Sequence, residues 1–433
     1  MKQMNTNAVY IHNAMQALEG FTFPGIEDYA SRALTNQGGI AIIAKSPHMS
    51  EESIRTILEY YSSIGLGVDG VLCLPVGEDG DLYPGLQSEN ACKAINSFID
   101  EGYRIQFFNT RAGMEEEVIR KLGLDWNKNT ISIPSKLADL GNNKAHVRRV
   151  AQDLKLGTLF PQHRIVSGFP DLVRAFHAMR SEYGEVVIKL PAWASGLGMA
   201  FGNSNDVLAG FVYDHSNRLN NVIVERSLGA HHVSMTIVKR FVDGQEVDSW
   251  ITNQDCLQRD GAVSHVGSVL GELPFVTSED AAWMQSATAP LYKHFLAKHP
   301  TLTGVINWDC IKGESGERYV LEGNFRVTFS TYIRSIQLSL AHTQKSLPGS
   351  VTCIVQKVHP RKEITSFAHL KHALGTALLQ DAMSAGVIPI VLPCLTRNGY
   401  CYFVAVGDSY ADALCALEES LERTCSQKRL VVS

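Results

Sequence analysis

The sequence lacks the features of secreted, membrane-spanning and nucleic-acid-binding proteins. Its nine cysteines are scattered, with no CxxC pair and no Cys/His cluster at zinc-like spacing, so we expect buried or free thiols in a reducing compartment. No apolar run approaches the ~20 residues that span a bilayer, and no early segment resembles a signal peptide. The net charge of −5 offers no basic surplus for nucleic acid. These absences predict a cytoplasmic protein that binds neither nucleic acid nor a membrane.

The composition is that of a globular chain with several domains. Its 433 residues, 45% of them hydrophobic and 19% charged, suffice for two or three domains with real cores. Residues 1–135 alternate short apolar runs with helix-like segments, which is typical of a small parallel α/β sheet. Helical and strand-like stretches follow over 136–345, and a last α/β segment over 346–433. We therefore predict three α/β domains with these bounds.

Polar side chains interrupt an apolar strand near the end of the second predicted domain. The stretch RYVLEGNFRVTF, residues 318–329, sets Glu322, Asn324 and Arg326 at every second position. Residues two apart on a strand point the same way, so these three side chains share one face. Just upstream, TGVINWDCI forms another strand, and the turn-like KGESGE joins the two. We expect an antiparallel hairpin.

The register of this hairpin predicts a cluster of carboxylates. A turn centred between residues 315 and 316 places Asp309 opposite Glu322, and Asn307 opposite Asn324. Two carboxylates directly opposed across a hairpin repel each other, and a cation between them removes the repulsion. Oxygen ligands favour a hard ion such as Mg²⁺, which shares its remaining coordination with substrate phosphates. A solvated strand face is the alternative. The opposite face shows a core pattern, formed by Trp308, Cys310, Leu321, Gly323 and Phe325.

A lysine and a glycine-rich loop indicate an anionic ligand. Lys189 lies in the apolar run VVIKLP, where an unpaired ammonium group would be costly or would lose its proton. The loop after it offers Ser195, Gly196 and Gly198, small residues that let backbone N–H groups approach phosphate oxygens. It is neither a Walker A loop, because no GK[ST] follows, nor a Rossmann fingerprint, because a strand comes next. A plain hairpin turn and a glycine-rich flap over a nucleotide both fit.

The order of these parts resembles the ATP-grasp superfamily. In chain order, there is a lysine at a helix start in GNNKAHV, the strand lysine, the flap SGLGM, a hinge strand VIVERSLG, and the closing pair WDCI and EGNFR. The closing pair resembles the family's metal signature, and the resemblance covers residues 136–345. More loosely, the flanking segments resemble those of the pheganomycin-type peptide ligases. The resemblance implies a pre-ATP-grasp α/β domain, a two-lobed ATP-grasp core and a small C-terminal extension.

The resemblance also implies a role for each matching residue. The nucleotide-binding residues would be Lys144, Lys189, Ser195, Gly196, Gly198, Glu225, Arg226, Leu228 and His232. One or two Mg²⁺ ions, with Mn²⁺ as the alternative, would be held by Asp309, Glu322 and Asn324, and the catalytic residues would be Arg326 and Lys189. Many members bind the ribose through a glutamate after the hinge glycine. That stretch reads GAHH here, so a histidine replaces the glutamate or the contact is lost.

The implied activity is that of an ADP-forming carboxylate–amine ligase. The γ-phosphoryl group of ATP would activate a small carboxylate as an acyl phosphate, and an amine would attack it, with amino acids or peptides as substrates. The alternatives are a thiol acceptor, as in a CoA ligase, a phosphoryl acceptor, as in a kinase, and a nucleotide-binding protein without catalysis. Against a biotin carboxylase, we expect unlike flanking domains and find no biotinyl carrier segment. A homodimer is one candidate assembly.

Overall fold

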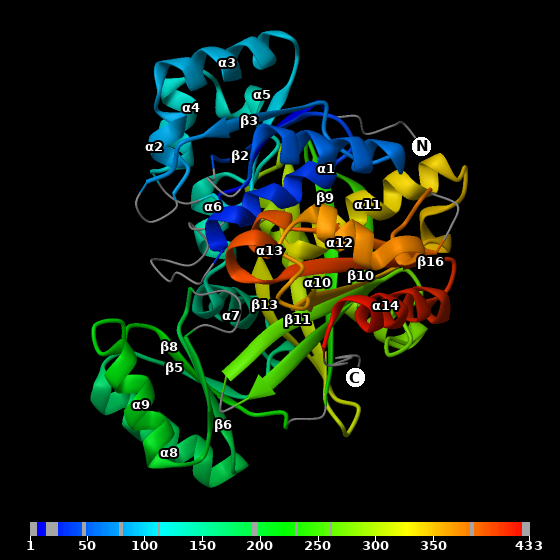
Figure 1. Cartoon of the computed structure of the whole chain (residues 1–433). Helices are drawn as coiled ribbons and strands as arrows, with labels where there is room; N and C mark the ends of the chain where they lie inside the picture. The colour runs from blue at the N-terminus through cyan, green and yellow to red at the C-terminus, as the bar shows by residue number, and fades with distance from the viewer. Residues whose placement is uncertain are drawn as a thin grey trace. The chain divides into compact units, whose positions relative to one another are not determined.

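The chain divides into two units by the contacts between its residues. Unit 1 contains residues 1–135, 267–274 and 327–433, and unit 2 contains residues 136–266 and 275–326. The three-domain division at residues 135 and 345 stays a prediction. The structure is a computed structural model (Figure 1). It describes residues 7–13, 25–45, 49–77, 81–110, 113–192, 198–229, 232–259, 262–381 and 385–426, without the side chains of 255–265 and 348.

Unit 1 contains the parallel sheet that the alternation of apolar runs and helical segments predicts. Its four strands lie in the order β3-β2-β1-β4, and all neighbouring strands are parallel. They are β1 (Ala8–Ile11), β2 (Ile40–Ala44), β3 (Gly70–Leu74) and β4 (Arg104–Phe107). Every residue of β1 and β2 is buried, as in parallel strands covered on both faces. The helices of this part are a 3₁₀ helix (Ile26–Thr35), α1 (Glu51–Ser63), α2 (Tyr83–Leu86), α3 (Glu89–Asp100), α4 (Glu115–Lys121) and α5 (Trp126–Asn129).

The rest of unit 1 is antiparallel. β16 (Cys401–Gly407) lies between β14 (Thr352–Val358) and β15 (Gly386–Ile390). The end of β11 (Ala262–Leu270) pairs with β14. The α-helices of this part are α11 (Phe329–Thr343), α12 (Phe367–Leu374), α13 (Leu392–Asn398) and α14 (Tyr410–Thr424), and two short 3₁₀ helices are Pro348–Ser350 and Gly375–Ala377.

Unit 2 contains a run of antiparallel strands in the order β13-β12-β9-β10. The strands are β9 (Val233–Val242), β10 (Gln245–Arg259), β12 (Gly304–Lys312) and β13 (Arg318–Asn324). Phe295 of α10 (Ser278–Lys298) packs edge-on against Phe325, with ring centroids 4.8 Å apart, and Trp308 lies 5.7 Å from Phe325. This aromatic core supports the β12–β13 hairpin from one face, which leaves its other face for polar side chains.

A second sheet of unit 2 has the order β5-β8-β6-β7, and its neighbouring strands are antiparallel. The strands are β5 (His163–Val166), β6 (Val186–Lys189), β7 (Met199–Gly202) and β8 (Val222–Arg226). α8 (Phe169–Tyr183) and α9 (Asn205–His215) lie on one face, where Phe176 and Phe211 pack against alternate residues of β6 and β8 (Figure 1). The other face carries the intervening residues. The remaining helices are α6 (Ser135–Gly141), α7 (Lys144–Asp153) and a 3₁₀ helix (Gly157–Leu159).

The described helices include none with the length and hydropathy of a membrane span. The described cysteines are all free thiols, in agreement with their scattered positions in the sequence.

Candidate nucleotide and metal site

The β12–β13 hairpin has the predicted register at its polar end. Asp309 lies opposite Glu322, and Asn307 lies opposite Asn324. The prediction is confirmed here because turn composition and two-residue alternation are local properties of the sequence. Two carboxylates therefore do face each other across neighbouring strands.

Nearer the turn, the predicted register is wrong by one residue. Cys310 lies opposite Val320 and Lys312 opposite Arg318, so the turn is centred on Ser315. Leu321 is the extra residue of a β-bulge, and it is only half-buried, contrary to the core position that alternation predicted. The other four predicted core residues, Trp308, Cys310, Gly323 and Phe325, are buried. The bulge thus lies directly beside the opposed carboxylates.

Uncharged donors surround Asp309. Its Oδ1 accepts hydrogen bonds from Thr236 Oγ1 at 2.7 Å and from Gln254 Nε2 at 3.3 Å, and its Oδ2 accepts one from Asn324 Nδ2 at 2.8 Å. Burial and the neighbouring Glu322 carboxylate raise the pKa of Asp309 to about 7. The charge of Arg326 and the hydrogen bonds from Thr236 and Asn324 lower this pKa, but burial and Glu322 outweigh them.

Glu322 is paired with a cation from another element. Its Oε2 lies 2.7 Å from Nζ of Lys144, the first residue of α7. Burial opposes the charge of Glu322, but the Lys144 ammonium overcomes this and lowers the pKa of the carboxyl. The loop before α7 contacts the same hairpin, because Asn142 Oδ1 accepts from Phe325 N at 2.7 Å. The structure therefore places Lys144 beside Glu322, one of the predicted metal ligands.

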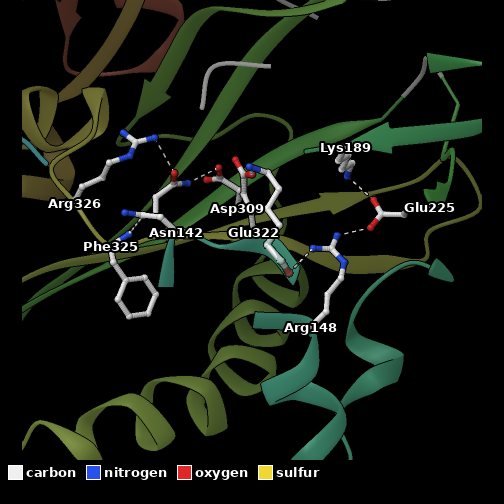
Figure 2. Close-up of polar contacts among 10 residues, drawn as sticks. Asn142, Arg148, Lys189, Glu225, Asp309, Glu322, Phe325 and Arg326 are labelled. Atoms are coloured by element: carbon white, nitrogen blue, oxygen red, sulfur yellow. Dashed lines mark hydrogen bonds and ion pairs between the residues drawn. The ribbon is translucent and has the colours of Figure 1, made fainter. Parts of the chain in front are cut away.

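Lys189 and Glu225 meet on the face of the second sheet opposite α8 and α9. In β6 and β8 the residues facing the helices are Val186, Ile188, Val222 and Val224, so Lys189 and Glu225 project from the opposite face. Lys189 Nζ donates to Glu225 Oε1, and both residues are buried (Figure 2). Burial lowers the pKa of Lys189 from its ordinary value, against the raising effect of Glu225. Glu225 is thus the anion that the buried lysine needs.

Arg148 is a member of this cluster that the sequence analysis missed. It lies one turn after Lys144 on α7, is fully buried, and donates through Nη2 to Glu225 Oε2 (Figure 2). Burial alone would raise the pKa of Glu225, but Arg148 and Lys189 overcome it and lower the pKa to about 2. Its spacing of four residues from Lys144 on one helix was the signal that could have identified it.

Of the remaining predicted residues, Arg326 also belongs to the hairpin cluster. Arg326 donates to Asn324 Oδ1 at 2.8 Å, and Arg226 lies 3.4 Å from Glu317 of the hairpin. Leu228 and His232 are half-buried. Gly198 has a positive φ of 67° and accepts through its carbonyl from Leu190 N at 2.8 Å. Ser195 and Gly196 lie outside the described residues.

The donor set at the hairpin suits a hard cation. Within the described residues, no group of three or more His, Cys, Asp and Glu side chains is arranged to hold a metal ion. The predicted set instead consists of two opposed carboxylates and an amide, Asp309, Glu322 and Asn324. Oxygen ligands of this kind match Mg²⁺, and burial together with Glu322 raises the pKa of Asp309, which a bound cation would lower. The residues present fit the ion.

Comparison with known proteins identifies the fold. No protein-family model and no curated protein sequence matches the chain. Among solved structures, biotin carboxylase from Campylobacter jejuni is similar over 96% of this chain and 91% of its own, with a TM-score of 0.57 and 11% identity. An L-amino acid ligase from Bacillus licheniformis is similar over 91% of this chain and 100% of its own, with a TM-score of 0.53 and 13% identity. The chain has the ATP-grasp fold.

A third ATP-grasp structure extends this result. An N5-carboxyaminoimidazole ribonucleotide synthetase is similar over 96% of both chains, with a TM-score of 0.52 and 13% identity. Because these similarities cover nearly the whole chain, the ATP-grasp likeness includes the segments on either side of residues 136–345. The expectation that the flanking parts differ in fold from those of biotin carboxylase is therefore wrong.

Proposed function

We propose that the chain is an ATP-dependent ligase that activates a carboxylate as an acyl phosphate and joins it to an amine. The observation that carries the proposal is the polar face of the hairpin, where Asp309 and Glu322 face each other with Lys144 2.7 Å from Glu322. The ATP-grasp fold supports it, and solved structures of this fold include complexes with ADP and with its magnesium salt.

In this proposal, the cations bind the triphosphate. Lys144 and Lys189 contact the phosphates, and the glycine-rich loop with Ser195, Gly196 and Gly198 covers them. The hinge main chain from Glu225 through Arg226 to Leu228 binds the adenine, and His232 is the candidate for the ribose. Asp309, Glu322 and Asn324 hold Mg²⁺, which neutralises charge on the phosphate oxygens when bound.

The same residues determine what chemistry the site supports. A carboxylate oxygen attacks the γ-phosphorus of ATP, the bond to the β-phosphate oxygen breaks, and ADP leaves. The amine then attacks the acyl carbon and phosphate leaves, with one proton released. Arg326 stabilises negative charge on the transferred group through its planar guanidinium. The site needs no nucleophilic side chain, because positioning and electrostatics supply the rate enhancement.

The test is ADP release from ATP and Mg²⁺ in the presence of pools of amino acids and small carboxylates, with hydroxylamine added to trap acyl phosphates. We expect one pool to stimulate ADP release and to give a hydroxamate without any amine. Product analysis with an amine or a thiol then identifies the acceptor. ADP release without hydroxamate would favour a phosphoryl acceptor, and ATP binding without stimulation by any pool would contradict a ligase.

A further inference from the structure

Arg148 has a position that packing alone does not explain. Its side chain is fully buried, and its guanidinium lies 5.0 Å from the Phe160 ring. It donates through Nη2 to Glu225 and through Nη1 to the main-chain oxygen of Lys144 at 3.2 Å. One side chain thus connects the first turn of α7 with the central strand β8 of the second sheet.

The charges of the cluster are unequal. Glu225 accepts from Lys189 through one carboxylate oxygen and from Arg148 through the other. A buried Lys189–Glu225 pair would be neutral, whereas the triad has two cations and one carboxylate. Burying a net charge is costly unless an anion compensates it. Glu322, which pairs with Lys144, also acts on Lys189. Sharing Glu225 with Arg148 leaves part of the Lys189 charge for a further anion such as a nucleotide phosphate.

The two predicted phosphate lysines lie on different elements, and Arg148 joins them. Lys144 begins α7, and Lys189 ends β6. A main-chain bond from Lys144 N to Pro191 O, 2.7 Å long, ties these elements together. This main-chain bond does not fix the rotamer of the Lys189 side chain. Arg148 restrains that side chain by holding its partner Glu225.

We infer that Arg148 is a positioning residue that sets the spacing of Lys144 and Lys189 for the phosphates of the nucleotide. The inference rests on the proposed function, since it concerns how these lysines meet ATP. It predicts that replacing Arg148 weakens the binding of ligands that carry phosphates. Adenosine, which has no phosphates, should bind equally well with and without Arg148.

The experiment compares ATP and adenosine binding to the full chain and its Arg148→Met and Arg148→Lys variants, by calorimetry for ATP and ligand-observed NMR for adenosine. For Arg148→Met we expect ATP affinity to fall by about tenfold or more and adenosine affinity to stay within about twofold. Arg148→Lys should restore part of the loss, because lysine keeps the charge without the fork that reaches two partners. The control is Arg149→Met, which removes the next arginine of α7, an exposed residue bonded to Asn221. It should bind ATP like the wild type.

A double-mutant cycle covers the case in which Arg148→Met does not fold. The double variant with Glu225→Gln removes the carboxylate together with the arginine, so no unpaired anion stays buried. If Arg148 acts through Glu225, adding Arg148→Met to Glu225→Gln should change ATP affinity by less than about twofold. A further tenfold loss there, or equal losses for ATP and adenosine in Arg148→Met, would overturn the inference. Wild-type protein that binds no ATP would overturn the proposed function itself.

Discussion

Each end of the β12–β13 hairpin brings two like charges together, but the groups that surround them differ. At the turn end, two cations face each other, because Lys312 lies opposite Arg318. Asp280 of α10 separates them, with Oδ2 3.0 Å from Lys312 Nζ and Oδ1 2.6 Å from Arg318 Nε. At the other end, two anions face each other, Asp309 and Glu322. At the first end one counter-ion bonds to both charges, whereas at the second Lys144 pairs with Glu322 and the hydrogen-bond donors to Asp309 are uncharged.

The pKa values of the two aspartates express this difference. Burial opposes the charge of Asp280, but hydrogen bonds from Thr277, Lys312 and Arg318 overcome it and hold the pKa of its carboxyl well below the usual range. The hydrogen-bond donors to Asp309 are uncharged, and burial together with Glu322 raises its pKa to about 7. A like-charge pair bridged by one counter-ion is expected to be structural. The Asp309–Glu322 pair, where Lys144 bonds to Glu322 and Asp309 has uncharged donors, is expected to take further positive charge from a ligand.

The strongest test of this contrast is Glu322→Gln. We expect turnover to fall by about 1000-fold or more, because the variant loses a carboxylate that the proposed metal requires. The fold should persist, since glutamine keeps the size of the side chain. ADP release measures turnover, and circular dichroism checks the fold. Glu279→Gln is the matched control, because Glu279 is an exposed residue 3.1 Å from Arg318 at the turn end. Retained activity in Glu322→Gln would contradict the metal assignment.

At the turn end the corresponding change is Asp280→Asn. It removes the anion between Lys312 and Arg318 and leaves only the exposed Glu279 beside Arg318. We therefore expect the free energy of unfolding to fall by about 3 kcal/mol. Activity per folded molecule should stay within about threefold of the wild type. Urea denaturation followed by circular dichroism measures the first quantity, and ADP release measures the second. A loss of activity as large as that of Glu322→Gln would mean that Asp280 belongs to the site.

The sequence predicted one end of the hairpin better than the other, for physical reasons. The pairing of Asp309 with Glu322 follows from the two-residue period of a strand and a short polar turn, which are both local. The bulge at Leu321 changes the register without a signal in the sequence. Asp280 resembles an ordinary acid in the first helical turn, because its two cationic partners, Lys312 and Arg318, are more than 30 positions away in the sequence.

The same limit applies to the candidate site. Lys189 could be singled out because a charge in an apolar run is visible in one segment, whereas Lys144 was identified through the resemblance to ATP-grasp proteins. The partnership of Arg148 with Glu225 joins segments 77 residues apart and required the structure. The parallel N-terminal sheet was predictable because alternation of strands and helices indicates one, whereas its strand order was not predicted.

The two ends should also differ in their response to pH, which Asp309→Asn tests. The folded-state pKa of Asp309 is raised from 3.8 to about 7, so the wild type loses stability as pH rises between these values. Asparagine does not ionise, so the variant does not lose stability over this pH range. We expect the variant to be more stable than the wild type by about 2 kcal/mol at pH 8 without metal, and the gap to close toward pH 4.

Urea denaturation in EDTA at several pH values measures this difference. For Asp280→Asn we expect the change in the free energy of unfolding to have the opposite sign under the same conditions. The pKa of Asp280 is lowered, so its contribution is full above the unfolded-state value of 3.8 and is lost as pH falls below it. That variant should therefore be less stable than the wild type at pH 8. If Asp309→Asn is less stable than the wild type at pH 8, the protein stabilises the charged form of Asp309, as it does for Asp280.

The smallest expected effects come from two matched threonines. Thr277 Oγ1 donates to Asp280 Oδ2 at 2.8 Å and caps α10, and Thr236 Oγ1 donates to Asp309 Oδ1 at 2.7 Å. Thr277→Val removes a helix cap, so we expect the free energy of unfolding to fall by about 1 kcal/mol with nucleotide binding unchanged.

Thr236→Val should act on ligand binding instead. The hydrogen bond from Thr236 favours the charged form of Asp309. Removing this bond raises the pKa of that carboxyl further, so a proton competes better with the metal. We expect the Mg²⁺-dependent part of ADP binding at pH 7 to weaken by about fivefold, and the loss to shrink at pH 9, where the carboxyl is ionised in both proteins. Calorimetry with ADP at two Mg²⁺ concentrations measures it. If Thr236→Val lowers only stability, as Thr277→Val does, both aspartates are structural and the contrast between the hairpin ends does not hold.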